Sequence, residues 1–280
     1  MNPPNISVSP EGKLTYFISD LHLGAAYFPD PVAHERMVVK WLRSIAPSAS
    51  RLYLVGDILD YWYEYRYVVP RGFTRFFGAL AEIADSGVEV TWFIGNHDIW
   101  IFDYLPREIG MRVVDGSLVE TIDGHRFYIS HGDGLGDIPR GFRIMRSIFR
   151  NRFCQKLFSS IHPRWTVGLA YAWSAYNRRH HKQPGDDGAC ESGKADGSTL
   201  LEFSRRFIDY NPDTPVDYFV YGHYHLMLDR NIPGTNARMI ILGDWIDKMS
   251  YAVFDGHRLE LCSLTDVRKP APDVAGSNVR

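Results

Sequence analysis

Short apolar runs that end at once in Asp, His or Asn are the main pattern of this chain. The runs have the length and the β-branched and aromatic content of buried strands: Thr15–Ser19, Leu52–Val55, Val90–Ile94, Phe127–Ser130 and Tyr218–Tyr221. Helical patterns separate the first three: Pro31–Ile45, with Pro at its start, and Phe73–Ser86, which Gly87 ends. This alternation of strand and helix predicts βαβ units, and therefore an α/β fold with parallel strands.

The second half of the chain predicts a return to the same sheet structure after a helical insertion. Strands are expected at Met239–Leu242, Tyr251–Phe254 and Leu259–Leu264, the last two forming a hairpin around Asp255-Gly256. The pattern of residues 137–211 is helical, and Thr199-Leu200-Leu201-Glu202 fits a capping box that opens a helix. We therefore expect a core of residues 1–136 and 212–266, a helical cap of residues 137–211 and a disordered tail of residues 267–280.

Composition indicates a globular protein with an uneven charge distribution. The chain has 280 residues, 45% hydrophobic and 23% charged, with a net charge of −2. Residues 138–183 contain ten basic residues and no acidic ones, which predicts an anionic partner for this region. Three scattered cysteines favour a reducing compartment. No secretory leader and no apolar run of about 18 residues stands out, so a cytoplasmic protein without a transmembrane segment is expected.

The polar residues that follow the apolar runs are of the metal-binding type. They form five motifs: Asp20-Leu21-His22, Gly56-Asp57, Gly95-Asn96-His97-Asp98, His131-Gly132-Asp133 and Gly222-His223-Tyr224-His225. Sites in α/β sheets lie beyond the carboxyl ends of strands, so we expect these motifs to meet at one edge. Carboxylate, imidazole and amide oxygens suit Mn²⁺, Fe or Zn²⁺. Two such cations, about 3.5–4 Å apart, could hold a phosphate between them, and a shared carboxylate, for which we choose Asp57, would offset their repulsion.

The order of these motifs resembles the calcineurin-like metallophosphoesterase superfamily, over roughly Leu14 to Leu264. The resemblance implies two packed mixed sheets flanked by helices, a four-layer αββα sandwich with an inserted helical cap. It also implies two metal ions that share Asp57: one is bound by Asp20, His22, Asp57 and His225, and the other by Asp57, Asn96, His131 and His223.

The resemblance assigns further roles close to the metals. His97 matches a histidine that is not a ligand and that contacts the scissile phosphate, and Asp60 matches the acid that orients this histidine in some relatives. A surface salt bridge is the alternative for Asp60. For Asp98 and Asp133, a hydrogen bond to a ligand is expected in preference to a direct role.

Sequence around the motifs narrows the resemblance to one branch. The segments Ser19–Leu23, Gly56–Trp62, His131–Asp133 and Leu242–Trp245 resemble the UDP-2,3-diacylglucosamine pyrophosphatases of lipid A biosynthesis. This branch implies hydrolysis of that lipid nucleotide to lipid X and UMP, by attack of a hydroxide that bridges two metal ions, expected to be Mn²⁺. Asn96, His97 and Trp62 are then candidate substrate contacts. The chain departs from well-known members in three places: at His97, where some carry Arg; at Tyr224, where Thr is common; and at Asp244, where a small residue is often found.

The predicted cap interleaves basic residues with aromatic and aliphatic ones, which suits an anionic membrane surface or an acyl-chain groove. The alternative is that the apolar residues only pack the cap on the core. Arg178 and Arg179 are candidate contacts for the polar head group. A UDP-diacylglucosamine lipid and the cytoplasmic face of the inner membrane are the expected partners, and no nucleic acid is expected. Other dimetal hydrolases (a nucleotide pyrophosphatase, phosphodiesterase or nuclease) and a metal-free scaffold remain alternatives.

Overall fold

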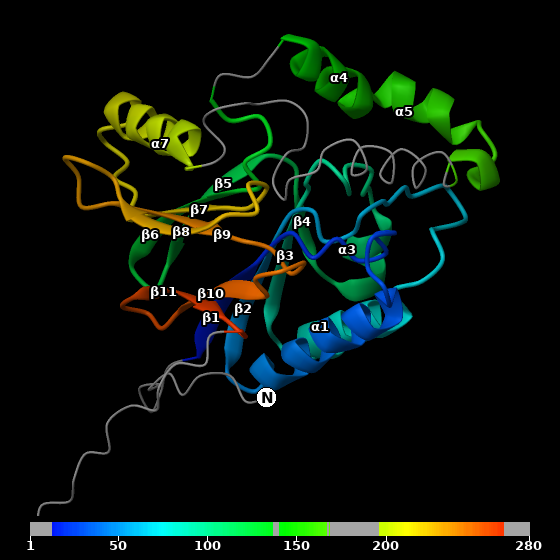
Figure 1. Cartoon of the computed structure of the whole chain (residues 1–280), viewed down its shortest axis with the longest axis horizontal. Helices are drawn as coiled ribbons and strands as arrows, with labels where there is room; N and C mark the ends of the chain where they lie inside the picture. The colour runs from blue at the N-terminus through cyan, green and yellow to red at the C-terminus, as the bar shows by residue number, and fades with distance from the viewer. Residues whose placement is uncertain (1–12, 137–139, 167, 169–195, 266–280) are drawn as a thin grey trace, which may run out of the picture.

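Two β-sheets packed face to face form the centre of the molecule (Figure 1). The computed structural model describes residues 13–136, 140–166, 168 and 196–265. The predicted tail at residues 267–280, and Arg178 and Arg179, lie outside these residues. No helix in the described part of the chain is long and apolar enough to cross a membrane.

The first sheet has six strands and a parallel centre. Its order is β11 (Leu259–Ser263), β10 (Ser250–Phe254), β1 (Leu14–Ile18), β2 (Ala49–Val55), β3 (Glu89–Phe93) and β4 (Arg112–Val114). Strands β1 to β4 are parallel, and the β10–β11 hairpin joins β1 in antiparallel fashion. The carboxyl ends of β1, β2 and β3 therefore meet at one edge.

The second sheet has five strands. Its order is β5 (Ser117–Ile122), β6 (His125–Ser130), β7 (Tyr218–Tyr221), β9 (Arg238–Leu242) and β8 (Met227–Asn231). Strands β6, β7 and β9 are parallel, whereas β5 and β8 run antiparallel at the two edges. Each sheet thus has a centre of parallel strands, and within each sheet the carboxyl ends of these strands lie at one edge.

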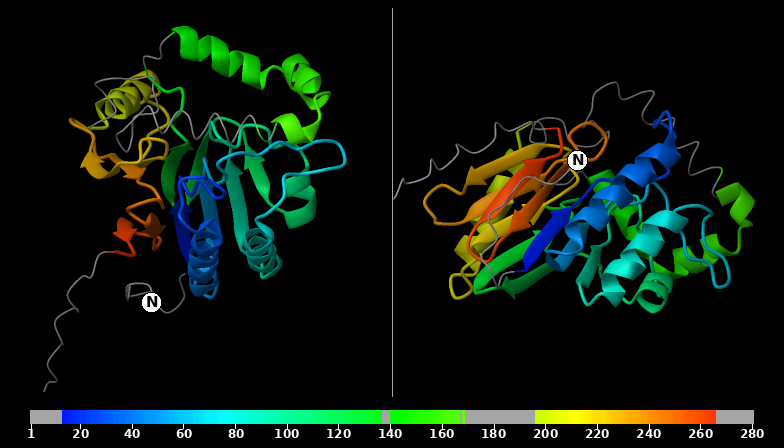
Figure 2. Two further views of the ribbon diagram at one scale, coloured as in Figure 1. Left: turned by 45° about the vertical axis from the view of Figure 1, so that its right-hand side comes forward. Right: turned by 90° about the horizontal axis from the view of Figure 1, so that it is seen from below.

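Helices complete a four-layer αββα arrangement, which confirms the predicted fold class (Figures 1 and 2). Helices α1 (Pro31–Ile45) and α2 (Thr74–Asp85) pack on the outer face of the six-stranded sheet, and α3 (Tyr104–Ile109) follows β3. Alternation along β1 supplies both faces of that sheet: Tyr16 and Ile18 face the helices, whereas Phe17 packs between the sheets. Both faces are buried, which explains why the strands read as continuous apolar runs.

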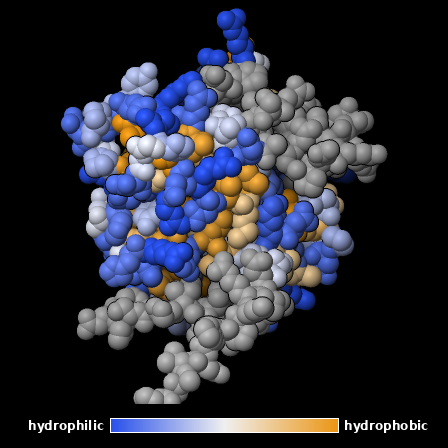
Figure 3. Space-filling view, turned by 60° about the vertical axis from the view of Figure 1, so that its left-hand side comes forward, coloured by the Kyte–Doolittle hydropathy of each residue, from blue (hydrophilic) through white to orange (hydrophobic). Residues whose placement is uncertain are grey.

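Helix α7 (Ser198–Tyr210) covers the outer face of the five-stranded sheet. Leu200 and the partly buried Phe203 and Phe207 pack with Phe219 and Tyr221 of β7. Seen from the side of α7 and β8, a strip of apolar surface lies between polar residues (Figure 3). The range predicted for the cap, residues 137–211, therefore includes a helix, α7, that packs on the core.

Helices α4 (Arg140–Arg150) and α5 (Arg152–Ser159) lie apart from the sheets, on the far side from α1 (Figures 1 and 2). Tyr63 donates a hydrogen bond to the carbonyl of Gln155 (2.6 Å), and the Trp100 indole donates one to the carbonyl of Phe149 (3.0 Å). Trp100 also stacks on Phe158, with ring centroids 5.0 Å apart. Aromatic residues of the core thus hold this segment in place.

The strands and helices expected from the apolar pattern are present within a few residues of their predicted bounds. The prediction of a capping box that starts at Thr199 is wrong. Helix α7 begins at Ser198, and its N-cap residue is Gly197, which has a φ of 72° and no side chain that could cap the helix. The pattern gave no expectation for β4, β5, β8 and α3, because these elements are short or half exposed.

Candidate metal centre

The predicted metal ligands converge from the ends of strands in both sheets. Asp20 and His22 follow β1, Asp57 follows β2, Asn96 follows β3, His131 follows β6, and His223 and His225 follow β7. Residues more than 200 positions apart in sequence, Asp20 and His223, are joined by a hydrogen bond from the His223 N–H to Asp20 Oδ2 (2.9 Å). The site therefore exists only when the two sheets are packed together.

Glycines in the motifs allow this convergence. A Cβ on Gly95 would lie 2.2 Å from Asp57 Oδ1, and one on Gly56 would lie 2.3 Å from His131 Nδ1. Gly56 also has a φ of 81°, which side chains seldom adopt. The Gly-Asp and Gly-Asn-His-Asp patterns thus reflect backbones that must pass next to ligand side chains.

Backbone strain is concentrated at the same residues. The described part of the chain has eight non-glycine residues with positive φ, and five of them are predicted ligands: Asp20, His22, Asp57, His223 and His225. Such conformations cost of order 1–3 kcal/mol each and persist where the surrounding structure enforces them. Their concentration here indicates that the fold directs these side chains to one point at a cost in stability.

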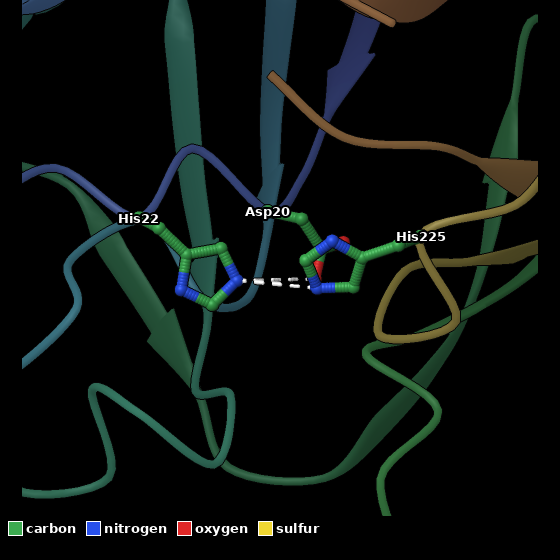
Figure 4. Close-up of side chains that lie close together, drawn as sticks. All are labelled: Asp20, His22 and His225. Carbon is green, nitrogen blue, oxygen red and sulfur yellow. Dashed lines mark hydrogen bonds and ion pairs between the residues drawn. The ribbon is translucent and has the colours of Figure 1, made fainter. Parts of the chain in front are cut away.

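One group of side chains consists of Asp20, His22 and His225 (Figure 4). The Nε2 atoms of His22 and His225 are 3.3 Å apart, and Asp20 Oδ1 lies 3.4 Å from His225 Nε2 and 3.9 Å from His22 Nε2. Two imidazole nitrogens and a carboxylate oxygen thus point at one another with no space for a further side chain between them.

A second group consists of Asp57, His131 and His223, with Asn96 beside it. His131 Nε2 lies 3.2 Å from Asp57 Oδ2 and 3.3 Å from Asn96 Oδ1. Asp57 Oδ2 is also 4.0 Å from His22 Nε2 in the first group. This carboxylate oxygen therefore lies between the two groups, at the position expected for a shared ligand.

The carboxylates have the bonding pattern of cation ligands. Asp57 Oδ1 accepts a hydrogen bond from the His97 N–H (2.8 Å), as Asp20 Oδ2 does from His223. The other oxygens, Asp20 Oδ1 and Asp57 Oδ2, are buried and face imidazole nitrogens, His225 Nε2 at 3.4 Å and His131 Nε2 at 3.2 Å. Burying a carboxylate is costly unless donors or a cation bind its oxygens, and a cation among the imidazoles would do so. The donor set therefore fits divalent metal ions.

Electrostatics lead to the same conclusion. Burial, together with the nearby Asp57, raises the pKa of Asp20 to about 7. Burial acts in the same direction on Asp57, but the imidazoles of His131 and His97 outweigh it and hold the pKa of Asp57 well below its usual range. Two adjacent buried carboxylates are difficult to ionise together, and a bound cation would allow both to be charged.

His97 and Asp60 lie at the edge of the first group. His97 Nδ1 is 3.1 Å from the backbone carbonyl of Asp60 and 3.6 Å from its Oδ1, and the His97 side chain is 22% exposed. Asp60 Oδ1 also lies 3.4 Å from His22 Nδ1, and Asp60 is buried, so the surface salt bridge considered for this residue is excluded. Asp60 therefore lies next to both His22, a candidate metal ligand, and His97, the residue expected to contact the phosphate.

Other carboxylates brace the site from outside. Asp98 accepts hydrogen bonds from the N–H groups of Ile58 (2.9 Å) and Gly95 (2.7 Å) and so ties the second motif to the third. Asp133 binds Arg146 of α4, with 3.0 Å between Oδ2 and Nε. The sequence did not reveal this link between the fourth motif and the cap, because nothing in the spacing pairs the two residues.

The prediction that Trp62 contacts the substrate is wrong. Trp62 is 0% exposed and packs with Phe73, Phe77 and Tyr104. Its indole N–H is donated to Glu64 (3.2 Å). Trp62 is a core residue. The other candidate contacts of the polar head group, Arg178 and Arg179, lie outside the described residues.

Comparison with known proteins identifies the family. The model of the calcineurin-like phosphoesterases matches residues 14–227. This chain belongs to the calcineurin-like phosphoesterase family. The predicted enzyme class is thereby confirmed, and the family and the residue groups together imply divalent metal ions.

This phosphoesterase is similar to proteins named UDP-2,3-diacylglucosamine hydrolase. The protein of Porphyromonas gingivalis is 40% identical over 90% of this chain and 98% of its own length. That of Neisseria meningitidis serogroup A is 32% identical over 83% of this chain and 90% of its own length. The resemblance to this branch is therefore confirmed over most of the chain. The match to a solved archaeal phosphodiesterase covers 90% of this chain and 99% of the other, at 11% identity and a TM-score of 0.42.

Proposed function

We propose that this phosphoesterase hydrolyses the diphosphate of UDP-2,3-diacylglucosamine to 2,3-diacylglucosamine 1-phosphate and UMP. The choice of substrate rests on the 40% identity to a UDP-2,3-diacylglucosamine hydrolase, over 98% of that protein. The chemistry is supported by the site, where Asp57 Oδ2 lies between His131 Nε2 (3.2 Å) and His22 Nε2 (4.0 Å).

Asp20, His22, Asp57 and His225 would hold one divalent cation, and Asp57, Asn96, His131 and His223 the other. When bound, the two cations, for which we propose Mn²⁺, supply Lewis-acid activation of water and charge neutralisation at the phosphate. The residues themselves do the rest: the strained backbones fix the ligand geometry before substrate arrives, and the burial of Asp20 and Asp57 keeps bulk water from competing for them.

His97 would stabilise or protonate the leaving phosphate. The Asp60 carbonyl oxygen accepts a hydrogen bond from Nδ1–H of His97 at 3.1 Å, and this contact orients the ring. Nε2 lies on the side of the ring away from this contact. In the imidazolium form, which carries a proton on both nitrogens, Nε2 would donate a hydrogen bond or the proton itself to a phosphate oxygen. Asp60 thus acts through His97 and His22 and does not touch the substrate.

The α4–α5 segment would bind the lipid and the membrane. Together with the residues that follow α5 up to Thr166, it exposes apolar side chains that are at least 40% accessible: Ile144, Met145, Ile148, Phe149, Phe153, Leu157, Ile161 and Trp165. Exposed basic residues, among them Arg143, Arg152, Lys156 and Arg164, lie between them. An apolar face bordered by cations suits an anionic leaflet, so we propose a peripheral protein on the cytoplasmic face of the inner membrane.

Hydrolysis assays separate this proposal from its alternatives. Protein loaded with Mn²⁺ is given UDP-2,3-diacylglucosamine in detergent micelles, in parallel with UDP-glucose, ADP-ribose and an aryl phosphodiester. We expect rapid UMP release from the lipid substrate alone. Equal turnover of the small substrates would support hydrolysis at two metal ions and would contradict the proposal that the lipid is the specific substrate.

Membrane binding is tested separately by sedimentation with vesicles. We expect binding to vesicles with phosphatidylglycerol and much weaker binding to neutral phosphatidylcholine vesicles, with a decline as salt is raised. Equal partition into both kinds of vesicle would contradict the electrostatic part of the proposal, and no binding to either would contradict the whole.

A further inference from the structure

Asp244 follows β9 in a turn that packs against the first group of candidate ligands. The backbone N–H of the next residue, Trp245, donates to the carbonyl of Asp20 (3.1 Å). Asp244 itself is 2% exposed, and its Oδ2 lies 3.8 Å from His225 Nδ1. A buried carboxylate thus faces the ring nitrogen of His225 opposite the one directed at Asp20.

Asp244 is held firmly in this position. Its Oδ1 accepts hydrogen bonds from the backbone N–H groups of Ile246 (3.0 Å), Asp247 (2.8 Å) and Lys248 (3.2 Å). Its Oδ2 also binds the Lys248 ammonium at 2.6 Å. The position of the carboxylate is therefore set by its own turn and does not depend on a contact with His225.

The same arrangement occurs at the other histidine of this group. His22 Nδ1 faces Asp60 Oδ1 at 3.4 Å. In the second group, by contrast, His131 Nδ1 donates to a neutral acceptor, the backbone carbonyl of Val55, at 2.9 Å. Carboxylates behind ligating imidazoles fix the tautomer and raise the basicity of the coordinating nitrogen more than a neutral carbonyl does.

We infer that Asp244 positions His225 and makes the Asp20–His22–His225 group the tighter of the two cation sites. The inference rests on the proposed role of these residues as metal ligands. It gives the enzyme an order of loading, in which this group fills first. It also gives a role to Asp244, which stands where a small residue is common in the well-known members of the branch.

The test is a titration of metal-free protein with Mn²⁺, followed by calorimetry and by electron paramagnetic resonance. We expect two separable binding steps, the first giving the signal of an isolated Mn²⁺ and the second a coupled pair. Asp244→Asn keeps an oxygen for the backbone N–H groups of the turn, and should weaken the first step about 10–100-fold while the second stays unchanged.

Two matched variants assign the steps. Asn96→Ala removes a candidate ligand of the second group and should weaken the second step alone. Asp247→Asn removes an exposed carboxylate three residues along the same turn and should change neither. If wild-type protein binds fewer than two Mn²⁺, the proposed metal centre fails. If it binds two with equal affinity, or if Asp244→Asn leaves the first step unchanged, only the inference on Asp244 fails.

A spectroscopic measurement and a second variant distinguish positioning from a general loss of structure. In Zn²⁺-loaded wild-type protein, ¹⁵N NMR should show His225 with its proton on Nδ1, and the Asp244→Asn variant should shift that resonance alone among the ligand histidines. Lys248→Met removes the cation that competes for Asp244 Oδ2 and should strengthen the first step several-fold. Weaker binding in Lys248→Met, or an unshifted His225 resonance in Asp244→Asn, would overturn the inference.

Discussion

The candidate metal-binding groups and the α4–α5 segment both depart from the usual distribution of side chains, in opposite directions. Asp20 and Asp57 are 0% exposed, whereas Phe153 and Leu157 of α5 are 76% and 64% exposed. Buried carboxylates and exposed apolar side chains are each unfavourable unless something binds them. Under the proposed function, the difference corresponds to two tasks: the core edge would bind cations and phosphate, and α4–α5 would bind the lipid and the membrane.

The two regions also differ in how they are fixed. Hydrogen bonds between motifs and strained backbones hold the candidate metal-binding groups. Aromatic contacts, two hydrogen bonds from core side chains, and ion pairs of Arg146 and Arg150 link α4–α5 to the core. Chemistry needs fixed distances, and an amphipathic surface does not. Changes at the core edge should therefore affect every substrate, and changes in α4–α5 only the lipid one.

The largest effect is expected at Asp57. Asp57→Ala removes the carboxylate shared by both groups, and should lower kcat roughly 10³-fold or more for the lipid substrate and for an aryl phosphodiester alike. Metal content, measured by atomic emission, should fall well below two ions per chain. Asp213→Ala, at an exposed position, is the control. Full metal content in Asp57→Ala would contradict the shared role.

His97→Ala should reduce turnover about 10²–10⁴-fold, because the donor to the phosphate is lost. The metal content should stay at the wild-type level, since His97 belongs to neither proposed ligand set. Kinetics and metal analysis on the same sample test both statements. Wild-type turnover of this variant would remove His97 from the proposed mechanism.

Metal removal tests the stability of the core edge. Dialysis against a chelator should lower the Tm, because ligands that bind only the folded state stabilise it by mass action, about 2.7 kcal/mol at a hundredfold excess over Kd. Scanning calorimetry before and after addition of Mn²⁺ measures the change. An identical Tm in both forms would show that the buried carboxylates are already balanced without a cation.

The double substitution Ile148→Glu and Leu157→Glu tests the other region. Two charges on the exposed apolar face should reduce binding to anionic vesicles and turnover of vesicle-bound lipid substrate about tenfold. Hydrolysis of a soluble aryl phosphodiester should be unchanged. Equal losses on both substrates would mean that the two regions are not separable as described.

The smallest effect is expected where the two regions meet. Tyr63→Phe deletes the hydrogen bond to the Gln155 carbonyl, worth about 1 kcal/mol, and should raise KM for the lipid substrate a few-fold with kcat unchanged. Steady-state kinetics with micellar substrate measure this. A fall in kcat alone would place Tyr63 in the chemical step, contrary to its position.

Sequence patterns predicted the order and type of most core elements, because buried strands read as continuous apolar runs and α1 and α2 have clear helical periodicity. They also predicted that the motifs meet, because parallel strands end at the same edge of a sheet. They did not reveal that the motifs come from two sheets. They did not show where α7 packs, since an amphipathic helix does not reveal which surface covers its apolar face. They failed for Trp62, since spacing from Asp57 does not reveal on which side of the chain a side chain is buried.

By itself, the sequence determined the family, the motif residues and the apolar segments, because these depend on residue type and local spacing. Only the tertiary structure decided how they combine. It brought Asp20 within hydrogen-bond distance of the backbone of His223 across two sheets, placed Asp57 between two histidine groups, and set Asp60 and Asp244 behind His22 and His225. The reason is that such contacts arise from the packing of distant segments, which local propensity and periodicity do not encode.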